Sequence, residues 1–146
     1  MKIFRSLEEV PKSDNISLAI GNFDGVHLGH AEIISQCRSE SSWKSAILTF
    51  DIHPRKFLYP DFAPLSLTLP SEKYAFFETL GIDFVIELPF AEYYSMDPIK
   101  FLDKLKQELK LKQITIGFNF FFGKNQKGNS EIAFWWGRSA GVKINV

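Results

Sequence analysis

The sequence predicts a three-layer α/β/α fold, with helices on both faces of a mostly parallel, five-stranded sheet. Two observations carry this prediction. Short runs rich in apolar and β-branched residues alternate along the chain with segments of helical periodicity. The runs are apolar on both faces, which is typical of parallel strands covered by helices and joined by right-handed crossovers. The predicted strands comprise residues 16–20, 46–50, 84–88, 114–116 and 142–146.

Helical periodicity predicts helices over residues 29–38, 71–80, 97–109 and, more weakly, 130–137. Asp97-Pro98 is a typical helix start, because a capping carboxylate is followed by a proline whose fixed φ suits the first turn. Gly81, directly after Leu80, is a typical helix stop. We expect residues 1–146 to form one domain, because no repeat, low-complexity segment or long linker divides them.

The composition describes an ordinary globular chain of 146 residues, 45% of them hydrophobic and 23% charged. A chain of this length buries about two-thirds of its unfolded surface, so its core needs no disulfide or structural metal. The single cysteine, Cys37, excludes an internal disulfide and fits a reducing compartment, so we expect a cytoplasmic location. No signal peptide or membrane span is expected, since charges interrupt every apolar stretch well before about 18 residues.

The net charge is zero, yet the charges are unevenly distributed. Residues 100–146 contain nine basic and three acidic residues, and the preceding part has the opposite excess. Most of these lysines flank an apolar stripe at helical spacing, which fits a solvated helix face. The alternative is that Lys124 and Lys127, which lie beside glycines, help to hold phosphate. We expect no nucleic-acid partner.

Functional residues are expected directly after the apolar runs, because parallel sheets bind ligands outside the carboxyl ends of their strands. The first run is followed by G-N-F-D-G-V-H-L-G-H, which leads into a helix. Its glycines let the backbone turn tightly and approach a ligand. His27 and His30 are three residues apart, so both imidazoles project from one side of the first helical turn. With the exposed amides and the helix dipole, this turn suits an anion such as a nucleoside triphosphate.

A zinc site formed by His27, His30 and His53 is an alternative use of the same residues. The chain has no pair of cysteines and no His-rich run, and Cys37 falls in the middle of a predicted helix. We therefore expect no metal held by protein ligands.

The H-x-G-H motif after a first strand resembles the nucleotidyltransferase superfamily, which also includes the class I aminoacyl-tRNA synthetases. The longer string from Gly21 to His30 is similar to the signature of the FMN adenylyltransferase module of prokaryotic FAD synthetases, which is usually joined to a riboflavin kinase domain. The resemblance implies a Rossmann-like nucleotidyltransferase fold and a catalytic role for His27 and His30. It implies nucleotide binding by the residues around them, which are Gly21, Asn22, Phe23, Asp24, Gly25 and Gly29.

A second motif follows the second predicted strand. The string T-F-D-I-H-P-R is similar to the family's F-x-P-H-P segment, with Ile52 in place of the first proline. A proline would have restricted its own φ, so the replacement leaves this backbone less constrained. The resemblance implies that Phe50, His53 and Pro54 contact the flavin.

A third motif follows the fourth predicted strand, where G-F-N-F-F-F-G-K-N-Q-K-G is similar to the family's G-x-[DN]-F-x-F-G segment. The resemblance implies that Asn119 lies in the active site and that Phe122 lies near the flavin. The family often has arginine where Gln126 stands, and Lys124 or Lys127 is expected to substitute for it. The phenylalanines could all pack in the core, but three in succession must expose at least one ring, which suits stacking on isoalloxazine or adenine.

The implied reaction is FMN plus ATP giving FAD and pyrophosphate. The attacking phosphate oxygen is already anionic, so the site must align two anions and stabilise charge rather than supply a strong base. Mg²⁺ is expected to bridge the phosphates while keeping most of its waters. Family members carry a further Ser/Thr-rich motif ending in Ile-Arg after the fifth strand. This sequence ends at Val146, so we expect an incomplete adenylyltransferase domain, without a kinase domain, that binds weakly and transfers slowly or not at all.

The sequence leaves three alternatives open. One is a truncated, noncatalytic module that binds flavin or nucleotide. Another is a different H-x-G-H nucleotidyltransferase, acting for example on phosphopantetheine or glycerol phosphate, although the motifs after the second and fourth strands argue against it. A class I synthetase is disfavoured, because the chain is short and has no lysine-rich loop resembling K-M-S-K-S. The sequence leaves the oligomeric state open.

Overall fold

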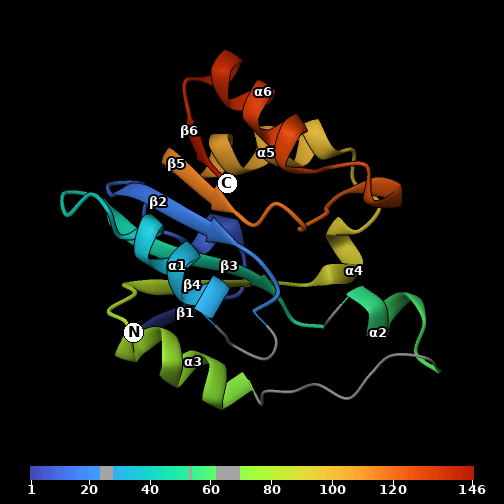
Figure 1. The fold of residues 1–146 in the computed structure, drawn as a ribbon, viewed down its shortest axis with the longest axis horizontal. Helices are drawn as coiled ribbons and strands as arrows, with labels where there is room; N and C mark the ends of the chain where they lie inside the picture. Colours follow the sequence, from blue (N-terminus) through green and yellow to red (C-terminus); the bar gives the residue numbers. More distant parts are fainter. Residues whose placement is uncertain (24–27, 53, 62–69) are drawn as a thin grey trace.

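The computed structural model describes residues 1–23, 28–52, 54–61 and 70–146 (Figure 1). A six-stranded sheet with the order β1-β4-β3-β2-β5-β6 forms its centre, and every neighbouring pair of strands is parallel. The strands are β1 (Lys2–Phe4), β2 (Asn15–Ile20), β3 (Lys44–Phe50), β4 (Phe84–Leu88), β5 (Lys110–Ile116) and β6 (Lys143–Asn145). The helices are η1 (Leu7–Glu9), α1 (Leu28–Cys37), α2 (Pro54–Leu58), α3 (Pro70–Thr79), α4 (Phe90–Tyr93), α5 (Pro98–Glu108), η2 (Lys124–Gln126) and α6 (Ser130–Ala140).

The predicted fold class is confirmed, but the predicted number of strands is wrong. The additional strand, β1, lies at the edge of the sheet and pairs with β4 in the register Lys2↔Phe84. It has three residues, one of which is charged, so it lacks the length and pattern by which a strand is recognised in a sequence. The five strands that were predicted are all present.

Helices cover the sheet on both faces (Figure 1). Alternate residues of a strand point to opposite sides of a sheet. On β2, Leu18 packs in a cluster with residues of α5 and α6, such as Phe101 and Trp136. The next residue, Ala19, packs in a second cluster with residues of α1 and α3, such as Phe77. The chain therefore forms the predicted three layers, with an apolar core on each side of the sheet.

The predicted helix ends are confirmed at two places and corrected at a third. Asp97 caps α5, since its carboxylate accepts hydrogen bonds from the amides of Ile99 and Lys100 at 3.0 and 3.1 Å. Gly81, at φ +80°, follows the end of α3. Helix α6 continues past Gly137, the predicted end, to a left-handed Gly141 at φ +75°.

The order of the strands determines where a ligand can enter. The chain leaves β2 to form β3 on one side of it and later returns to form β5 on the other side, so β2 lies at a topological switch point. In open parallel sheets, ligands bind in the crevice outside the carboxyl ends of the strands at such a point. Ile20 and Ile116 are paired at these ends of β2 and β5, so Gly21 and Gly117 are the first residues beyond them.

Within the described ranges, no helix has the length and apolar character needed to cross a lipid bilayer.

Candidate functional site

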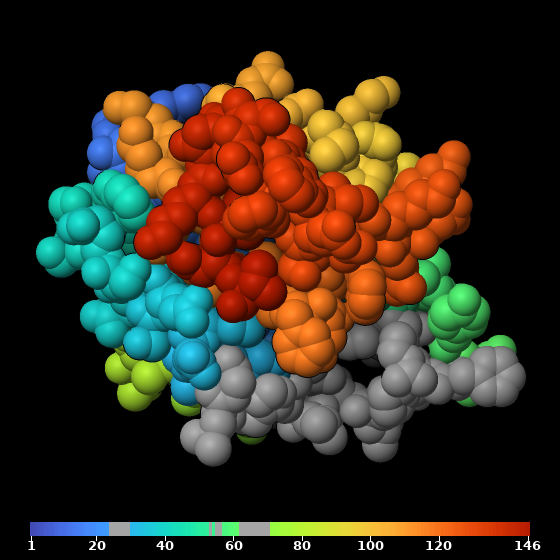
Figure 2. All heavy atoms as spheres, turned by 45° about the horizontal axis from the view of Figure 1, so that its top comes forward, coloured from blue at the N-terminus to red at the C-terminus, as the bar shows by residue number. Residues whose placement is uncertain are grey.

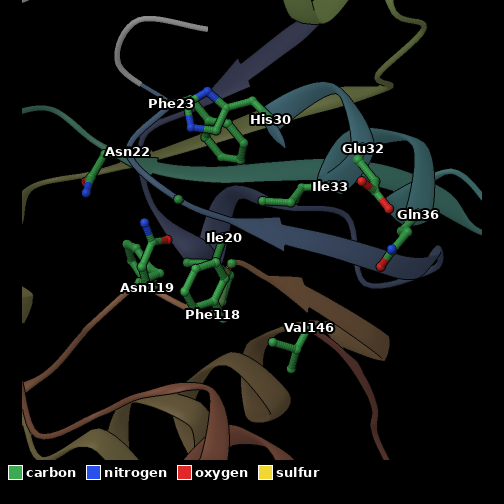
Figure 3. Close-up of a pocket in the computed structure, with 13 residues that line it drawn as sticks. Ile20, Asn22, Phe23, His30, Glu32, Ile33, Gln36, Phe118, Asn119 and Val146 are labelled. Atoms are coloured by element: carbon green, nitrogen blue, oxygen red, sulfur yellow. The ribbon is translucent and has the colours of Figure 1, made fainter. Parts of the chain in front are cut away.

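A cavity of about 510 Å³ opens at this switch point (Figure 3). Its volume lies within the range of about 300–1,000 Å³ that is usual for small-molecule sites. The turn after β2 and helix α1 form one side, and the segment after β5 with the end of the chain forms the other. In the space-filling view, the C-terminal residues in dark red lie beside α1 in light blue (Figure 2). The described lining residues are Ile20, Gly21, Asn22, Phe23, His30, Glu32, Ile33, Gln36, Gly117, Phe118, Asn119, Phe120 and Val146.

Phe23 packs beneath the turn after β2 and helps to hold it. This residue has φ +54°, which is rare for a bulky side chain, and its ring is almost fully buried. The ring packs edge-on against His30 at a centroid distance of 5.3 Å and against Phe77 of α3 at 5.4 Å. Phe23 therefore contributes to the site by fixing the turn and supporting the imidazole of His30, which lines the cavity.

The backbone of the same turn is attached to the sheet and to α3. The amide of Gly21 donates to the carbonyl oxygen of Leu48 on β3 at 3.2 Å. The carbonyl oxygen of Asn22 accepts hydrogen bonds from Lys73 Nζ at 3.1 Å and from Thr49 Oγ1 at 3.4 Å. Neither Lys73 nor Thr49 was among the predicted site residues.

The opposite wall is the segment that follows β5. Here the Phe120 amide donates to the Gly117 carbonyl oxygen at 3.1 Å, which closes a tight turn. A Cβ atom at Gly117 would lie 3.3 Å from Asn119 Oδ1 and 3.5 Å from Ile33 Cδ1, so glycine lets this wall approach α1 closely. The side chain of Asn119 is exposed to the cavity and points toward Asn22 (Figure 3). The structure thus brings together the two turns that were predicted to share a site.

Helix α1 continues the wall that begins with the turn after β2. Glu32 and Gln36 are four residues apart and, with Ile33, line the cavity from one face of the helix. Glu32 is the only acidic residue among the described lining residues, and none of these is a lysine or an arginine. The sequence pattern of α1 gives no sign of this role, because the face is mixed polar and apolar.

The phenylalanine run after β5 exposes some rings and buries others, as three successive residues must. Phe118 is 78% exposed and Phe121 is 49% exposed, whereas Phe122 is only 6% exposed. The Phe122 ring packs against Phe101 of α5 at 5.7 Å and stacks with Phe120 at 6.3 Å. The rings available for stacking on a ligand are therefore Phe118 and Phe121, while the flavin contact of Phe122 stays a prediction.

The F-D-I-H-P segment leads to a second, much smaller cavity. Phe50 and Pro54 line this space, which measures about 20 Å³ and is surrounded by aromatic rings of α4 and of the run after β5. It offers room for about one water molecule and none for an isoalloxazine ring. Phe120 lines both cavities, so the two regions that the motifs predicted to bind nucleotide and flavin are neighbours.

The two lysines predicted to hold phosphate lie outside the large cavity. Lys124 and Lys127 are exposed on and directly after η2, and neither lines the cavity. The Lys124 amide donates to the Met96 carbonyl oxygen at 2.8 Å, which fixes this loop against the start of α5. Their contribution to phosphate binding stays a prediction.

Four predicted site residues lie outside the described ranges, and these are His27, Asp24, Gly25 and His53. Gly29 belongs to the first turn of α1. Among the residues that the structure describes, no three His, Cys, Asp or Glu side chains are grouped so that they could hold a metal ion.

Comparisons of the sequence with known families give a consistent result. A family model described as FAD synthetase matches residues 9–146. The bifunctional riboflavin kinase/FMN adenylyltransferase of Bacillus subtilis is 36% identical over 116 residues, which cover 76% of this chain and 37% of that protein. The protein of the same name from Buchnera aphidicola subsp. Schizaphis graminum is 32% identical over 135 residues, covering 88% of this chain and 43% of its relative. The chain thus spans less than half the length of these curated relatives.

Solved structures with the same fold come from proteins of other names. A crystal structure described as a macrolide-efflux protein from Streptococcus pneumoniae matches with a TM-score of 0.79 at 20% identity, over 98% of this chain and 49% of that one. A pantoate-beta-alanine ligase from Francisella tularensis matches with a TM-score of 0.64 at 14% identity, over 99% of this chain and 65% of that one. At these identities, the matches establish the fold alone.

Proposed function

Since this chain belongs to the FAD synthetase family, we propose that it acts as an FMN adenylyltransferase, converting FMN and ATP to FAD and pyrophosphate. One observation carries the proposal beyond family membership. The first turn of α1, which carries His30, and the turn after β5, which carries Asn119, line one cavity at the switch point of the sheet (Figure 3). This is where an α/β fold binds a nucleotide, and the cavity is large enough for one.

The chemistry is a displacement at the α-phosphorus of ATP. An anionic oxygen of the FMN phosphate forms the new bond to this phosphorus, while the bond to the β-phosphate oxygen breaks and pyrophosphate leaves with the electron pair. No proton has to be removed from the nucleophile. The protein must therefore align two anions and stabilise charge in the transition state.

Four polar side chains that line the cavity have roles in this scheme. His30 donates a hydrogen bond to a phosphate oxygen from the first turn of α1, where the helix dipole also favours an anion. The amide of Asn119 positions a phosphate or ribose group without adding charge. Glu32 and Gln36, farther along the same wall, face the nucleoside end of the ligand.

The flavin is proposed to lie beside the aromatic residues that separate the two cavities. The smaller cavity cannot hold an isoalloxazine ring, so the ring stacks on exposed aromatic surface of Phe118 and Phe121. Phe50, Pro54 and Phe122 line the smaller cavity together with Phe121, so they lie close to this surface. The neighbouring positions of the two cavities would let the FMN phosphate reach the α-phosphorus.

Mg²⁺ is proposed to accompany ATP as a phosphate-bound ion that neutralises developing charge. Mg²⁺ usually keeps several waters and takes few protein ligands at such sites, which fits the scattered oxygen donors of the described walls. Among the described lining residues, the side-chain oxygens belong to the Glu32 carboxylate and to the amides of Asn22, Gln36 and Asn119.

The test is a turnover assay with FMN, ATP and Mg²⁺, in which FAD is separated by chromatography and pyrophosphate is measured independently. We expect FAD formation that falls about 100-fold in His30→Ala and in Asn119→Ala, the usual cost of losing a donor to transition-state charge. Glu131→Gln, at an exposed position of α6, serves as the control and should leave the rate unchanged. Binding of ATP and FMN without FAD formation would support a noncatalytic binding module instead.

A further inference from the structure

One face of α3 contacts the turn after β2 at two points. Lys73 and Phe77 are four residues apart, so their side chains project from the same side of the helix. Lys73 Nζ donates to the Asn22 carbonyl oxygen at 3.1 Å, and the fully buried Phe77 ring packs edge-on against Phe23. The turn is therefore attached to α3 through both its backbone and its side chain.

The position of Lys73 determines which way the next peptide group faces. The two donors to the Asn22 carbonyl oxygen, Lys73 on α3 and Thr49 on β3, place this oxygen on the β3 side of the turn. The peptide between Asn22 and Phe23 is trans, so its N–H points away from its carbonyl oxygen. The Phe23 N–H therefore points away from Lys73 and Thr49, and Phe23 lines the cavity whose opposite wall contains Asn119.

This N–H has no hydrogen-bond partner among the residues that the structure describes. Backbone donors directed into an anion site are a common means of binding phosphate. The left-handed conformation of Phe23, at φ +54°, is one that surrounding contacts have to maintain. Lys73 provides such a contact and also adds a positive charge behind a cavity wall whose described part contains Glu32 and no lysine or arginine.

We propose that Lys73 is a positioning residue for adenylyl transfer, which holds the Asn22 carbonyl oxygen and thereby directs the Phe23 N–H to the triphosphate. The proposal rests on the proposed function, because it takes the large cavity to be the ATP site. Lys73 does not line the cavity, so it acts through the peptide group and not by contact with the ligand.

The test compares Lys73→Met, which removes the donor, with Lys73→Arg, which retains a cationic donor of similar length. Lys100→Met, on the exposed side of α5, is the matched control. Affinities for ATP and for adenosine are measured by titration, FAD formation by chromatography, and stability by urea unfolding. We expect Lys73→Met to weaken ATP binding and to lower kcat/KM about tenfold, the usual effect of losing a hydrogen bond from a charged group.

Three further readouts separate positioning from a general structural role. Adenosine affinity should stay within about twofold of the starting value, because no phosphate is involved. Lys73→Arg should recover most of the ATP affinity. In protein labelled with ¹⁵N-phenylalanine, ATP should shift the Phe23 amide resonance in the unmodified chain and not in Lys73→Met, the resonance being assigned by its loss in Phe23→Leu.

Several outcomes would overturn the inference. ATP affinity in Lys73→Met equal to that of the unmodified chain would do so while leaving the proposed function intact. An equal loss of ATP affinity, adenosine affinity and stability would show a structural role only. If the unmodified chain neither binds ATP nor forms FAD, the proposed function fails and the inference fails with it. If the unmodified chain binds ATP without forming FAD, the effect of Lys73→Met on ATP affinity, compared with its effect on adenosine affinity, still decides whether Lys73 is a positioning residue.

Discussion

The rings of Phe23 and His30 pack edge-on across the turn after β2, with centroids 5.3 Å apart and planes inclined by 61°. This contact couples a core residue to a cavity-lining imidazole. Phe23 is buried among residues of α1 and α3, whereas His30 lines the cavity. The orientation of the imidazole therefore depends on packing beneath the turn as well as on α1.

Replacing the Phe23 ring with a smaller side chain should therefore lower both the stability of the fold and the affinity for ATP. We expect Phe23→Leu to lower the free energy of unfolding by about 1–2 kcal/mol, through lost buried area and lost aromatic contacts. ATP affinity should fall as well, because His30 loses its edge-on support. Urea unfolding and ATP titration measure the two effects. Phe134→Leu makes the same change on an exposed ring of α6 and should alter neither quantity appreciably.

A buried polar network joins strands β2, β5 and β6 to the end of α1. Gln113 on β5 is 1% exposed, and its Nε2 donates to Ser17 Oγ at 2.7 Å and to the Gln36 carbonyl oxygen at 3.2 Å. Its Oε1 accepts a hydrogen bond from Asn145 Nδ2 on β6 at 3.2 Å. One side chain thus connects β2, β5, β6 and the end of α1.

We expect Gln113→Leu to destabilise the fold by about 2–3 kcal/mol, because it leaves buried polar partners without hydrogen bonds. This loss of stability should be clearly larger than the loss caused by a typical substitution on the surface. Lys112→Gln, at the exposed neighbouring position on β5, should change stability by less than about 0.5 kcal/mol. Chemical denaturation of both variants provides the comparison, and equal stabilities would show that the network contributes little.

The buried strands could be predicted because they are apolar on both faces, but this criterion finds only part of β5. Lys110 and Lys112 are exposed on β5 while Leu111 and Gln113 are buried, so its first half alternates between solvent and core. A continuous apolar run occurs only over its last residues. The strand β1 was missed for a related reason, since its pairing with β4 depends on a contact that is distant in sequence.

The candidate site could be predicted where glycines mark the turns after β2 and β5. The two turns meet because β2 and β5 are neighbouring parallel strands, whose carboxyl ends lie at the same edge of the sheet. Lys73 could not be found this way, since nothing in the pattern of α3 links it to a turn some fifty residues earlier. Their charge, the adjacent glycines and the family resemblance indicated Lys124 and Lys127, and the structure places both on an exposed loop. Local sequence thus reveals the turns, and topology determines which helix supports them.

Gly137 lies inside α6, where alanine would ordinarily be more favourable by about 1 kcal/mol. A Cβ atom there would lie 2.5 Å from the Val142 carbonyl oxygen and 2.5 Å from Ile144 Cγ1. The backbone oxygen cannot move without displacing β6. This close approach explains why the helix passes through a glycine that looks like a helix end in the sequence.

We therefore expect Gly137→Ala to be destabilising by about 2 kcal/mol, since overpacking against backbone outweighs the gain in helix propensity. Gly141→Ala is the informative comparison, because a Cβ atom there meets nothing within 4 Å and the cost comes only from φ +75°. That cost should be about 1 kcal/mol. Because β6 leads to Val146 in the cavity wall, only Gly137→Ala should also weaken ATP binding.

Cys37 is fully buried at the end of α1 and donates from Sγ to the Ser17 carbonyl oxygen at 3.2 Å. Burial raises the pKa of this thiol above its ordinary value of 9.0, although hydrogen bonding with Ser17 partly opposes the shift. The native thiol should therefore stay protonated and resist alkylation by iodoacetamide at pH 8. In urea-unfolded protein it should react readily.

The same shift makes stability depend on pH in a defined direction. Above about pH 9 the unfolded chain loses the thiol proton while the folded chain keeps it, so the free energy of unfolding falls as pH rises. Cys37→Ala lacks this contribution. The difference in stability between the unmodified chain and Cys37→Ala should be constant below pH 8 and should then decline by up to about 1.4 kcal/mol per pH unit above pH 9. Tyr93, whose pKa burial also raises, is present in both proteins, so its contribution cancels in the difference. A difference that stays constant up to pH 10 would contradict the assignment of a raised pKa to Cys37.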